Sequence, residues 1–114
     1  MDSRYKIIYT SKWYQTYDNC IDYILYVLCN VFAAKNLIED IEKIIDKLQT
    51  DAASHAICDD SILHKYGIRR VHLAKHSYKI YYYTTNDEEV HVYALVHDLQ
   101  DFENQAEPEG FADT

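Results

Sequence analysis

The stretch from Asn30 to Thr50 constrains the fold more than any other part of the chain, because its apolar residues recur at three- and four-residue steps. These apolar residues are Leu37, Ile38, Ile41, Ile44, Ile45 and Leu48. Acids and lysines fill the opposite side, so the pattern predicts a long amphipathic helix that Asn30 can cap. Such a helix needs a second layer of structure to cover its apolar face.

A second helix is predicted just before the first, from Ser11 to Cys29. Its apolar and aromatic residues follow the same spacing: Trp13, Tyr17, Cys20, Ile21, Ile24, Leu25 and Leu28. A hydroxyl at Thr10-Ser11 can cap its start. Since almost no residues separate the two helices, we expect an antiparallel helical hairpin, with Trp13 packed inside it.

Short runs rich in valine, isoleucine and tyrosine predict strands on either side of this hairpin. One run precedes it, Tyr5–Tyr9, and the polar stretch Thr50–Ser61 that follows the hairpin predicts a loop. Three more runs then follow: Ile68–Ala74, Tyr78–Thr85 and Glu89–His97. Their short connections predict an antiparallel meander. We therefore expect an α+β fold of order β-α-α-β-β-β, in which the two-helix hairpin packs on a small antiparallel sheet.

The length of 114 residues suits one compact domain, which we place at 1–104, followed by an acidic and flexible tail at 105–114. No apolar run approaches the roughly 18 residues that span a bilayer, so we expect no membrane contact and a cytoplasmic protein. The three cysteines form no CxxC motif and are expected to be free thiols. The histidine spacing predicts no metal site, and nothing in the sequence calls for a cofactor.

The net charge of −8 is distributed unevenly along the chain. Five of the 19 acidic residues lie in 101–114, which has no lysine or arginine. The stretch 61–86 has the opposite character, with five lysines or arginines, three histidines and no acid. This basic stretch is expected to attract an acidic partner despite the overall charge.

Strand alternation divides the basic stretch between the two faces of the predicted sheet. Val71, Leu73, Tyr78, Ile80 and Tyr82 are expected to face the helices. On the opposite, open face we expect a surface that binds a target or a partner protein, made of Arg70, His72, Lys79, Tyr81 and Tyr83. Arg69 is a further candidate for binding, although its position next to Arg70 favours an ion pair with an acid at the sheet edge. Tyrosines and a lysine in one strip can stack nucleic-acid bases, bind a protein, or simply cover the sheet.

Four short motifs occur in an order that resembles the RelE/ParE toxin superfamily of bacterial toxin–antitoxin modules. They are Asp22-Tyr23-Ile24, Gly67-x-Arg69, Tyr78-Lys79-x-x-Tyr82 and Val96-His97-x-x-x-Asp101. The resemblance is collinear over residues 5–102, and the long helical hairpin is more similar to the ParE branch than to RelE. It implies a toxin that a cognate antitoxin keeps inactive, in a homodimer or a heterotetramer with that antitoxin.

The resemblance implies two alternative targets. ParE-like members inhibit DNA gyrase, whereas RelE-like members cut mRNA on the ribosome. In the nucleases, residues matching Lys79 and His97 contact the scissile phosphate and take part in acid–base chemistry, and Arg70 is a candidate for stabilising the transition state. Asp98 and Gln100 depart from the family pattern, since these positions often carry an aromatic residue or an arginine. We therefore favour gyrase inhibition, with the nuclease as the alternative and a non-toxic interaction module as a third hypothesis.

Overall fold

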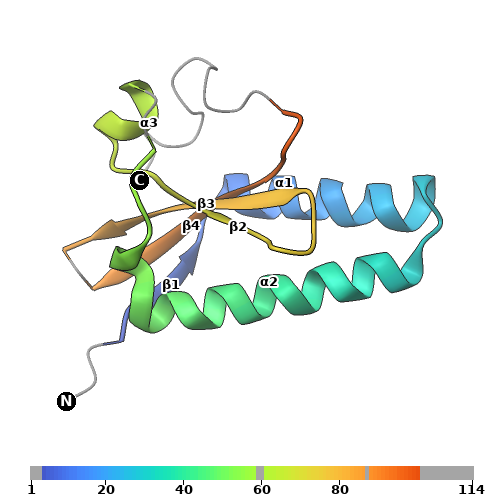
Figure 1. The fold of residues 1–114 in the computed structure, drawn as a ribbon, viewed down its shortest axis with the longest axis horizontal. Coiled ribbons are helices and arrows are strands. Elements are labelled where there is room, and N and C mark those ends of the chain that lie inside the picture. Colours follow the sequence, from blue (N-terminus) through green and yellow to red (C-terminus); the bar gives the residue numbers. More distant parts are fainter. Residues whose placement is uncertain (1–3, 59–60, 87, 101–114) are drawn as a thin grey trace.

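The computed structural model describes residues 4–58, 61–86 and 88–100. In chain order, it contains the strand β1 (Lys6–Tyr9), the helix α1 (Ser11–Asp22), a π-helical turn (Tyr23–Val27), the helix α2 (Val31–Asp51), a 3₁₀ turn (Ala52–Ser54), the short helix α3 (Ser61–Lys65) and the strands β2 (Arg69–His72), β3 (Tyr78–Thr85) and β4 (Glu89–His97). Figure 1 shows the helical hairpin on one side of the sheet and α3 on the other. The expected tail, 105–114, and the expected domain end at residue 104 lie outside the described residues.

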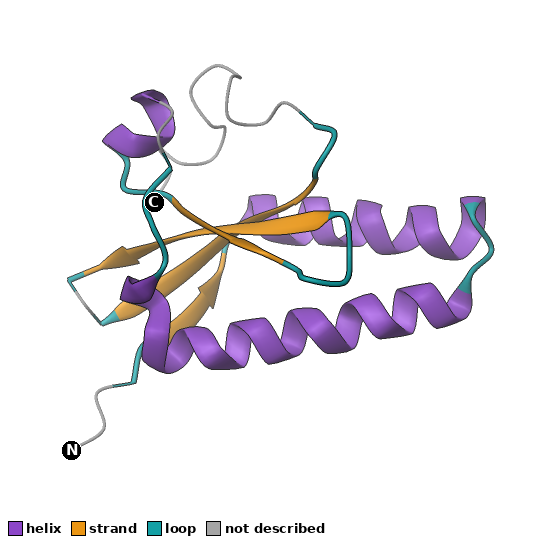
Figure 2. Ribbon diagram, viewed as in Figure 1, coloured by secondary structure: helices purple, strands orange, loops and turns teal. Residues whose placement is uncertain are grey.

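The sheet has the strand order β1-β4-β3-β2. The last three strands form the expected antiparallel meander, and β1 pairs with β4 in parallel, so the sheet is mixed rather than purely antiparallel. The reason is the helical hairpin, which separates β1 from the meander in the chain and lets β4 come to lie beside β1 in the same direction. Figure 2 shows this four-stranded sheet in orange, with the hairpin in purple. The expected α+β architecture is confirmed.

The start of each long helix is fixed by the residue that the sequence indicated. The Thr10 hydroxyl oxygen accepts a hydrogen bond from the Trp13 N–H at 3.1 Å, and the Asn30 side-chain oxygen accepts one from the Ala33 N–H at 3.0 Å. Both contacts satisfy N–H groups that have no partner within the helix. Trp13 is buried, as expected for a residue that packs the hairpin.

One large core lies between the hairpin and the sheet. The helices contribute residues such as Leu37, Ile41 and Leu48, all essentially buried. The sheet contributes Ile80 and Tyr82 from β3, together with Val71, Leu73, Val90, Val92 and Leu95. The expected inward face of β2 and β3 is therefore confirmed.

Two threonine hydroxyls join the hairpin to the part of β4 that lies beyond the end of β1. The Thr10 hydroxyl donates to the backbone carbonyl of Tyr93 at 3.0 Å and also lies 3.2 Å from that of Val92. The Thr16 hydroxyl accepts a hydrogen bond from the Leu95 N–H at 3.0 Å. Because β1 ends at Tyr9, the pairing between β1 and β4 also ends there. The contacts of Thr10 and Thr16 hold the next part of β4 in its place.

Replacing Thr16 with valine is expected to destabilise the fold by about 1–3 kcal/mol, because it keeps the shape of the side chain but leaves the Leu95 N–H without its acceptor. Urea unfolding followed by circular dichroism measures this difference. Thr16→Ser, which retains the hydroxyl, is the control and should lose much less. Equal stability of the valine variant and the wild type would show that the hydroxyl contact contributes nothing.

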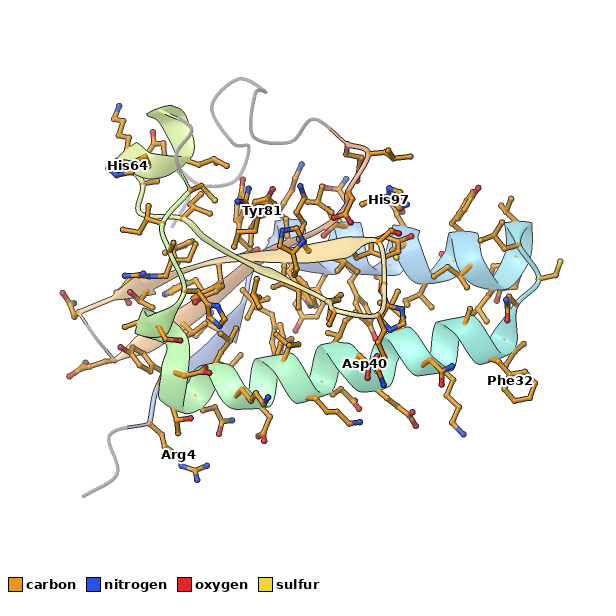
Figure 3. The ribbon with its side chains drawn as sticks, viewed as in Figure 1. Arg4, Phe32, Asp40, His64, Tyr81 and His97 are labelled. Carbon is orange, nitrogen blue, oxygen red and sulfur yellow. The ribbon has the colours of Figure 1, made fainter. Side chains whose placement is uncertain are left out.

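A polar contact attaches the turn between β2 and β3 to α2. His76 Nε2 lies 2.7 Å from Asp40 Oδ2, and both side chains are partly shielded from solvent. Figure 3 shows Asp40 directed from α2 toward the sheet side of the molecule. This hydrogen bond from His76 lowers the pKa of the Asp40 carboxyl, with a smaller opposing effect from burial.

The Asp40–His76 contact is expected to make stability depend on pH. Because the folded pKa of Asp40 is lower than the unfolded value of about 3.9, its contribution is complete above that value and is lost as the pH falls through the folded pKa. Asp40→Asn should therefore have a lower Tm than the wild type at neutral pH. The difference in Tm should disappear at acidic pH. Glu39→Gln, an exposed neighbour, is the control. A Tm difference that does not change with pH would contradict the role given to the Asp40–His76 contact.

Candidate functional site

Three of the predicted site residues lie together on the sheet face opposite the helical hairpin. In the β2–β3 register, Arg70 stands opposite Tyr81, and His72 stands opposite Lys79. Side chains that are directly opposite in an antiparallel pair point to the same face. We call Arg70, His72 and Lys79 the basic face.

The tyrosines of this face are buried, so the expectation of an open sheet surface was wrong. Tyr81 is 0% exposed and Tyr83 is 6% exposed. They belong to a second core, on the face away from the hairpin, whose other members are Cys58, Leu63, Ile68, Tyr93, Ala94 and Val96. Tyr81 and Tyr83 therefore hold the sheet against this second core, and the cations lie at its margin.

The cover of this second core comes from a segment for which the sequence predicted no helix. α3 ends at Lys65, and Gly67, two residues further on, has φ of 68°, a value that favours glycine. The Gly67 N–H donates to the His64 carbonyl, and the Ile68 N–H donates to the Leu63 carbonyl. This is the Schellman pattern that ends a helix. This helix end directs Leu63 and Ile68 into the second core. In the sequence, the available signal for this short helix was a glycine that follows a short run with apolar residues.

Arg69 lies on the face of the hairpin and has a structural role. Its guanidinium donates to the backbone carbonyls of Ala53 and His55, in the segment after α2. The Tyr82 hydroxyl donates to the neighbouring Ala52 carbonyl at 2.5 Å. The expected separation of Arg69 from Arg70 is confirmed, but the expected acidic partner is replaced by backbone carbonyls, because the chain leaving α2 passes directly beside β2.

His97 lies on the hairpin side of the sheet, away from Lys79. In the β3–β4 register His97 stands opposite Tyr78, whereas Lys79 stands opposite Val96. The imidazole of His97 packs edge-on against the Tyr78 ring, with 5.0 Å between their centroids. The three residues predicted to catalyse RNA cleavage, Lys79, Arg70 and His97, are therefore not brought together, since the sheet separates His97 from the other two.

A β-bulge in β4 places His97 on the opposite face of the sheet from Lys79. Tyr81 pairs with Ala94 and Tyr82 pairs with Val92, so Tyr93 is an extra residue in a β-bulge. Val92 faces the main core, Tyr93 and Ala94 both face the second core, and Leu95 returns to the main core. In a regular strand that begins with Val92 inward, alternation would place His97 on the face of Lys79. The bulge moves it to the other face.

The side chain of His97 has a defined tautomer in this arrangement. Its Nδ1 atom accepts a hydrogen bond from the Leu99 N–H at 3.0 Å. The Gln100 side-chain oxygen accepts one from the His97 N–H, also at 3.0 Å. When the ring is neutral, its hydrogen therefore resides on Nε2, which can donate a hydrogen bond but has no lone pair to act as a base.

His97 and Tyr78 line a hollow of about 590 Å³ between α1 and the end of β4. The other residues around it are Thr16, Asn19, Cys20, Tyr23, Leu95, Leu99 and Gln100. Burial raises the pKa of the Tyr78 hydroxyl, and its hydrogen bond with the Cys20 thiol raises it further. Burial likewise raises the pKa of Cys20, so this thiol stays protonated and is a poor nucleophile. The hollow thus offers hydrogen-bonding groups around an apolar wall rather than a reactive centre.

The sequence indicated few of the residues around this hollow. Tyr23 stood in one of the four family-like motifs, and Gln100 was noted only as a departure from the family pattern. Asn19 carried no signal, and Cys20 was indicated only as part of the apolar stripe of its helix, because that helix meets the end of β4 only in the folded chain.

The acidic residue after His97 reaches toward the basic face. An Asp98 carboxylate oxygen lies 3.9 Å from His72 Nδ1, and both side chains are substantially exposed. The Asp98 N–H donates to the Ser77 carbonyl at 2.8 Å, which fixes the backbone there. Asp98 therefore adds negative charge at the edge of the basic face, where the family pattern often has an aromatic residue or an arginine.

Within 4–58, 61–86 and 88–100, no three histidine, cysteine or acidic side chains are close enough to hold a metal ion. The helices in this described part are also too short or too polar to cross a membrane. The three cysteines form no disulfide bond in the described structure; Cys58 is buried and Cys29 is exposed.

The comparison with solved structures identifies the fold. A chain of a structure titled "Chromosomal ParDE TA system from P. aeruginosa" superposes with a TM-score of 0.67 at 18% sequence identity, covering 84% of this chain and 98% of that one. This chain therefore has the same fold as that chain of the ParDE system. At 18% identity the match shows the fold alone. No protein-family model and no curated protein matches the sequence.

The tautomer of His97 can be tested directly by long-range ¹H–¹⁵N NMR of the histidine rings. At a pH where the ring is neutral, the spectrum should show the hydrogen on Nε2, because Nδ1 is occupied by the Leu99 N–H. Leu99→Pro removes that N–H and should give a mixture of tautomers, whereas Leu99→Ala keeps it and should not. A hydrogen on Nδ1 in the wild-type protein would contradict the described geometry.

Proposed function

We propose that this chain is the toxin of a bacterial type II toxin–antitoxin module, that a cognate antitoxin keeps it inactive, and that it inhibits DNA gyrase in the manner of ParE. The observation that carries the proposal is the ParE-like fold, which extends over nearly the whole of the matched chain. The order of the four motifs in the sequence supports the same assignment. A toxin of this kind acts in the cytoplasm, where its target is found.

The basic face is the proposed point of attraction for the antitoxin. Arg70, His72 and Lys79 share this face, and the stretch 61–86 from which they come contains no acid. An acidic antitoxin segment would be steered toward it by long-range attraction. Because Tyr81 and Tyr83 are buried, we assign to them the support of this surface rather than direct contact with a partner.

Two observations favour gyrase over mRNA as the target. Cleavage at a ribose 2′-hydroxyl requires a base, a cation and an acid around one phosphate, whereas His97 lies across the sheet from Lys79 and Arg70. The long helical hairpin is also the feature that resembles the ParE branch.

The ribosome-dependent nuclease is the second candidate. The observation in its favour is the adjacent pair His72 and Lys79, two groups that could contact a phosphate from one face. An inert interaction module, which would use only the basic face, is the third.

Expression of the gene in a bacterial host separates these functions. We expect growth arrest with intact messages and an SOS response, and relief of the arrest when the neighbouring antitoxin gene is expressed as well. Purified chain should inhibit DNA supercoiling by gyrase in vitro. Primer extension on a translated message provides the contrasting measurement.

Variants give this experiment its controls. Cuts within codons that disappear in Lys79→Ala or His97→Ala would establish the nuclease and overturn the gyrase proposal. Lys47→Ala, an exposed lysine of α2 outside the basic face, should behave like the wild type throughout. No arrest with well-expressed, folded protein would instead favour the inert module.

A further inference from the structure

The turn of the helical hairpin carries a continuous apolar surface. We call Tyr26, Val27, Leu28, Val31 and Phe32 the hairpin tip. Their exposed fractions are 76, 64, 54, 67 and 80%, respectively. Figure 3 shows Phe32 at the end of the molecule, directed away from the sheet. Single exposed apolar residues are ordinary on a protein surface, but five within seven positions form a patch.

The hairpin tip is exposed because the two helices extend past the strands. Figure 1 shows the turn between α1 and α2 well beyond the end of the sheet. Ile24 and Ala34 are the last buried residues on the two arms before the turn. Cys29, with φ of 50°, and Asn30 then reverse the chain direction. The five residues of the hairpin tip lie between these two buried positions and are each more than half exposed.

The sequence of this region is also unusual in its charge. Residues 23–34 include no acid, lysine or arginine, although 26% of the whole chain is charged. A solvent-facing helical turn is ordinarily polar, because apolar groups there gain nothing from folding. The π-helical geometry of Tyr23–Val27 is a further departure from a simple surface turn, since such turns are rare and frequently lie at functional positions.

The hairpin tip is large enough to form an interface. Taking about 150–200 Å² for each side chain when fully exposed, the five exposed fractions correspond to roughly 500–700 Å². A standard protein interface buries roughly 800 Å² from each partner, so the tip with its immediate borders supplies most of that area.

The charges that border the patch indicate which partner fits it. Asp22 lies before it on α1, and Lys35 lies after it on α2, and both side chains are exposed. A two-fold arrangement in which the α1 arm of one molecule meets the α2 arm of the other places each acid opposite a lysine. Two copies therefore match each other in charge as well as in apolar surface.

We propose that the hairpin tip is a self-association surface, through which two copies of this chain form a two-fold symmetric dimer with reciprocal Asp22–Lys35 contacts. The net charge of −8 makes two copies repel each other over most of their surface. The tip and its borders are neutral in total, so association there avoids that repulsion. This dimer does not depend on the identity of the toxin's target.

Sedimentation equilibrium of the purified chain over a range of concentrations tests the proposal. The wild type should show a reversible monomer–dimer equilibrium. The double variant Val27→Ser/Phe32→Ser should raise the dissociation constant by about tenfold or more, because it removes an exposed apolar side chain from each arm of the hairpin tip. Both residues are exposed, so circular dichroism should show an unchanged fold. Leu99→Ser is the control, because Leu99 is an even more exposed apolar residue away from the tip.

Exchanging the charges of Asp22 and Lys35 distinguishes the specific dimer from non-specific association of the apolar surface. Asp22→Lys alone and Lys35→Asp alone should each weaken the dimer, since each places like charges together. The double exchange should restore it, because the opposite charges are paired again.

Three outcomes would overturn the proposal. The first is a wild-type chain that remains monomeric at every concentration, and the second is a dimer whose dissociation constant is unchanged by the serine substitutions. The third is a double charge exchange that dimerises no more tightly than the single variants. A monomeric wild type whose tip variants lose binding to the antitoxin or to gyrase would assign the tip to that other partner.

Discussion

The strand β3 is buried on both faces, and the rest of the structure depends on this condition. Ile80 and Tyr82 point into the core beneath the helical hairpin, while Tyr81 and Tyr83 point into the second core. A sheet of this kind needs a cover on each side, because an uncovered face would leave large aromatic side chains in water. The hairpin covers one face, and the segment around α3 provides part of the cover of the other.

The same sheet separates the basic face from the side chains around His97. On one face lie the cations that would attract an acidic partner, at the margin of the second core. On the other, His97 joins Tyr78 and Cys20 around a hollow beside α1, where hydrogen bonds hold the imidazole in one tautomer and burial keeps the thiol protonated. Recognition by a surface fits this arrangement better than the predicted RNA cleavage, since the sheet separates His97 from Lys79 and Arg70.

Much of the candidate site followed from strand alternation. The pattern placed Arg70, His72 and Lys79 on one face and separated Arg69 from them, and the β2–β3 register confirms this. Burial of Tyr81 was not predicted, because the alternation of one strand says which way a side chain points and not what lies above it. The cover comes from residues more than ten positions away, whose short helix carries too few residues for a clear periodic pattern.

The sequence by itself determined the elements whose signals are local: the two capped helices with their apolar stripes, and the strands β3 and β4 with their limits. Tertiary structure alone decided that β1 runs parallel to β4, that α3 covers the second face, and that a bulge at Tyr93 reverses the side on which His97 lies. The physical reason is range. Caps and stripes depend on neighbours within one or two turns, whereas pairing, cover and register depend on contacts between residues far apart in the chain.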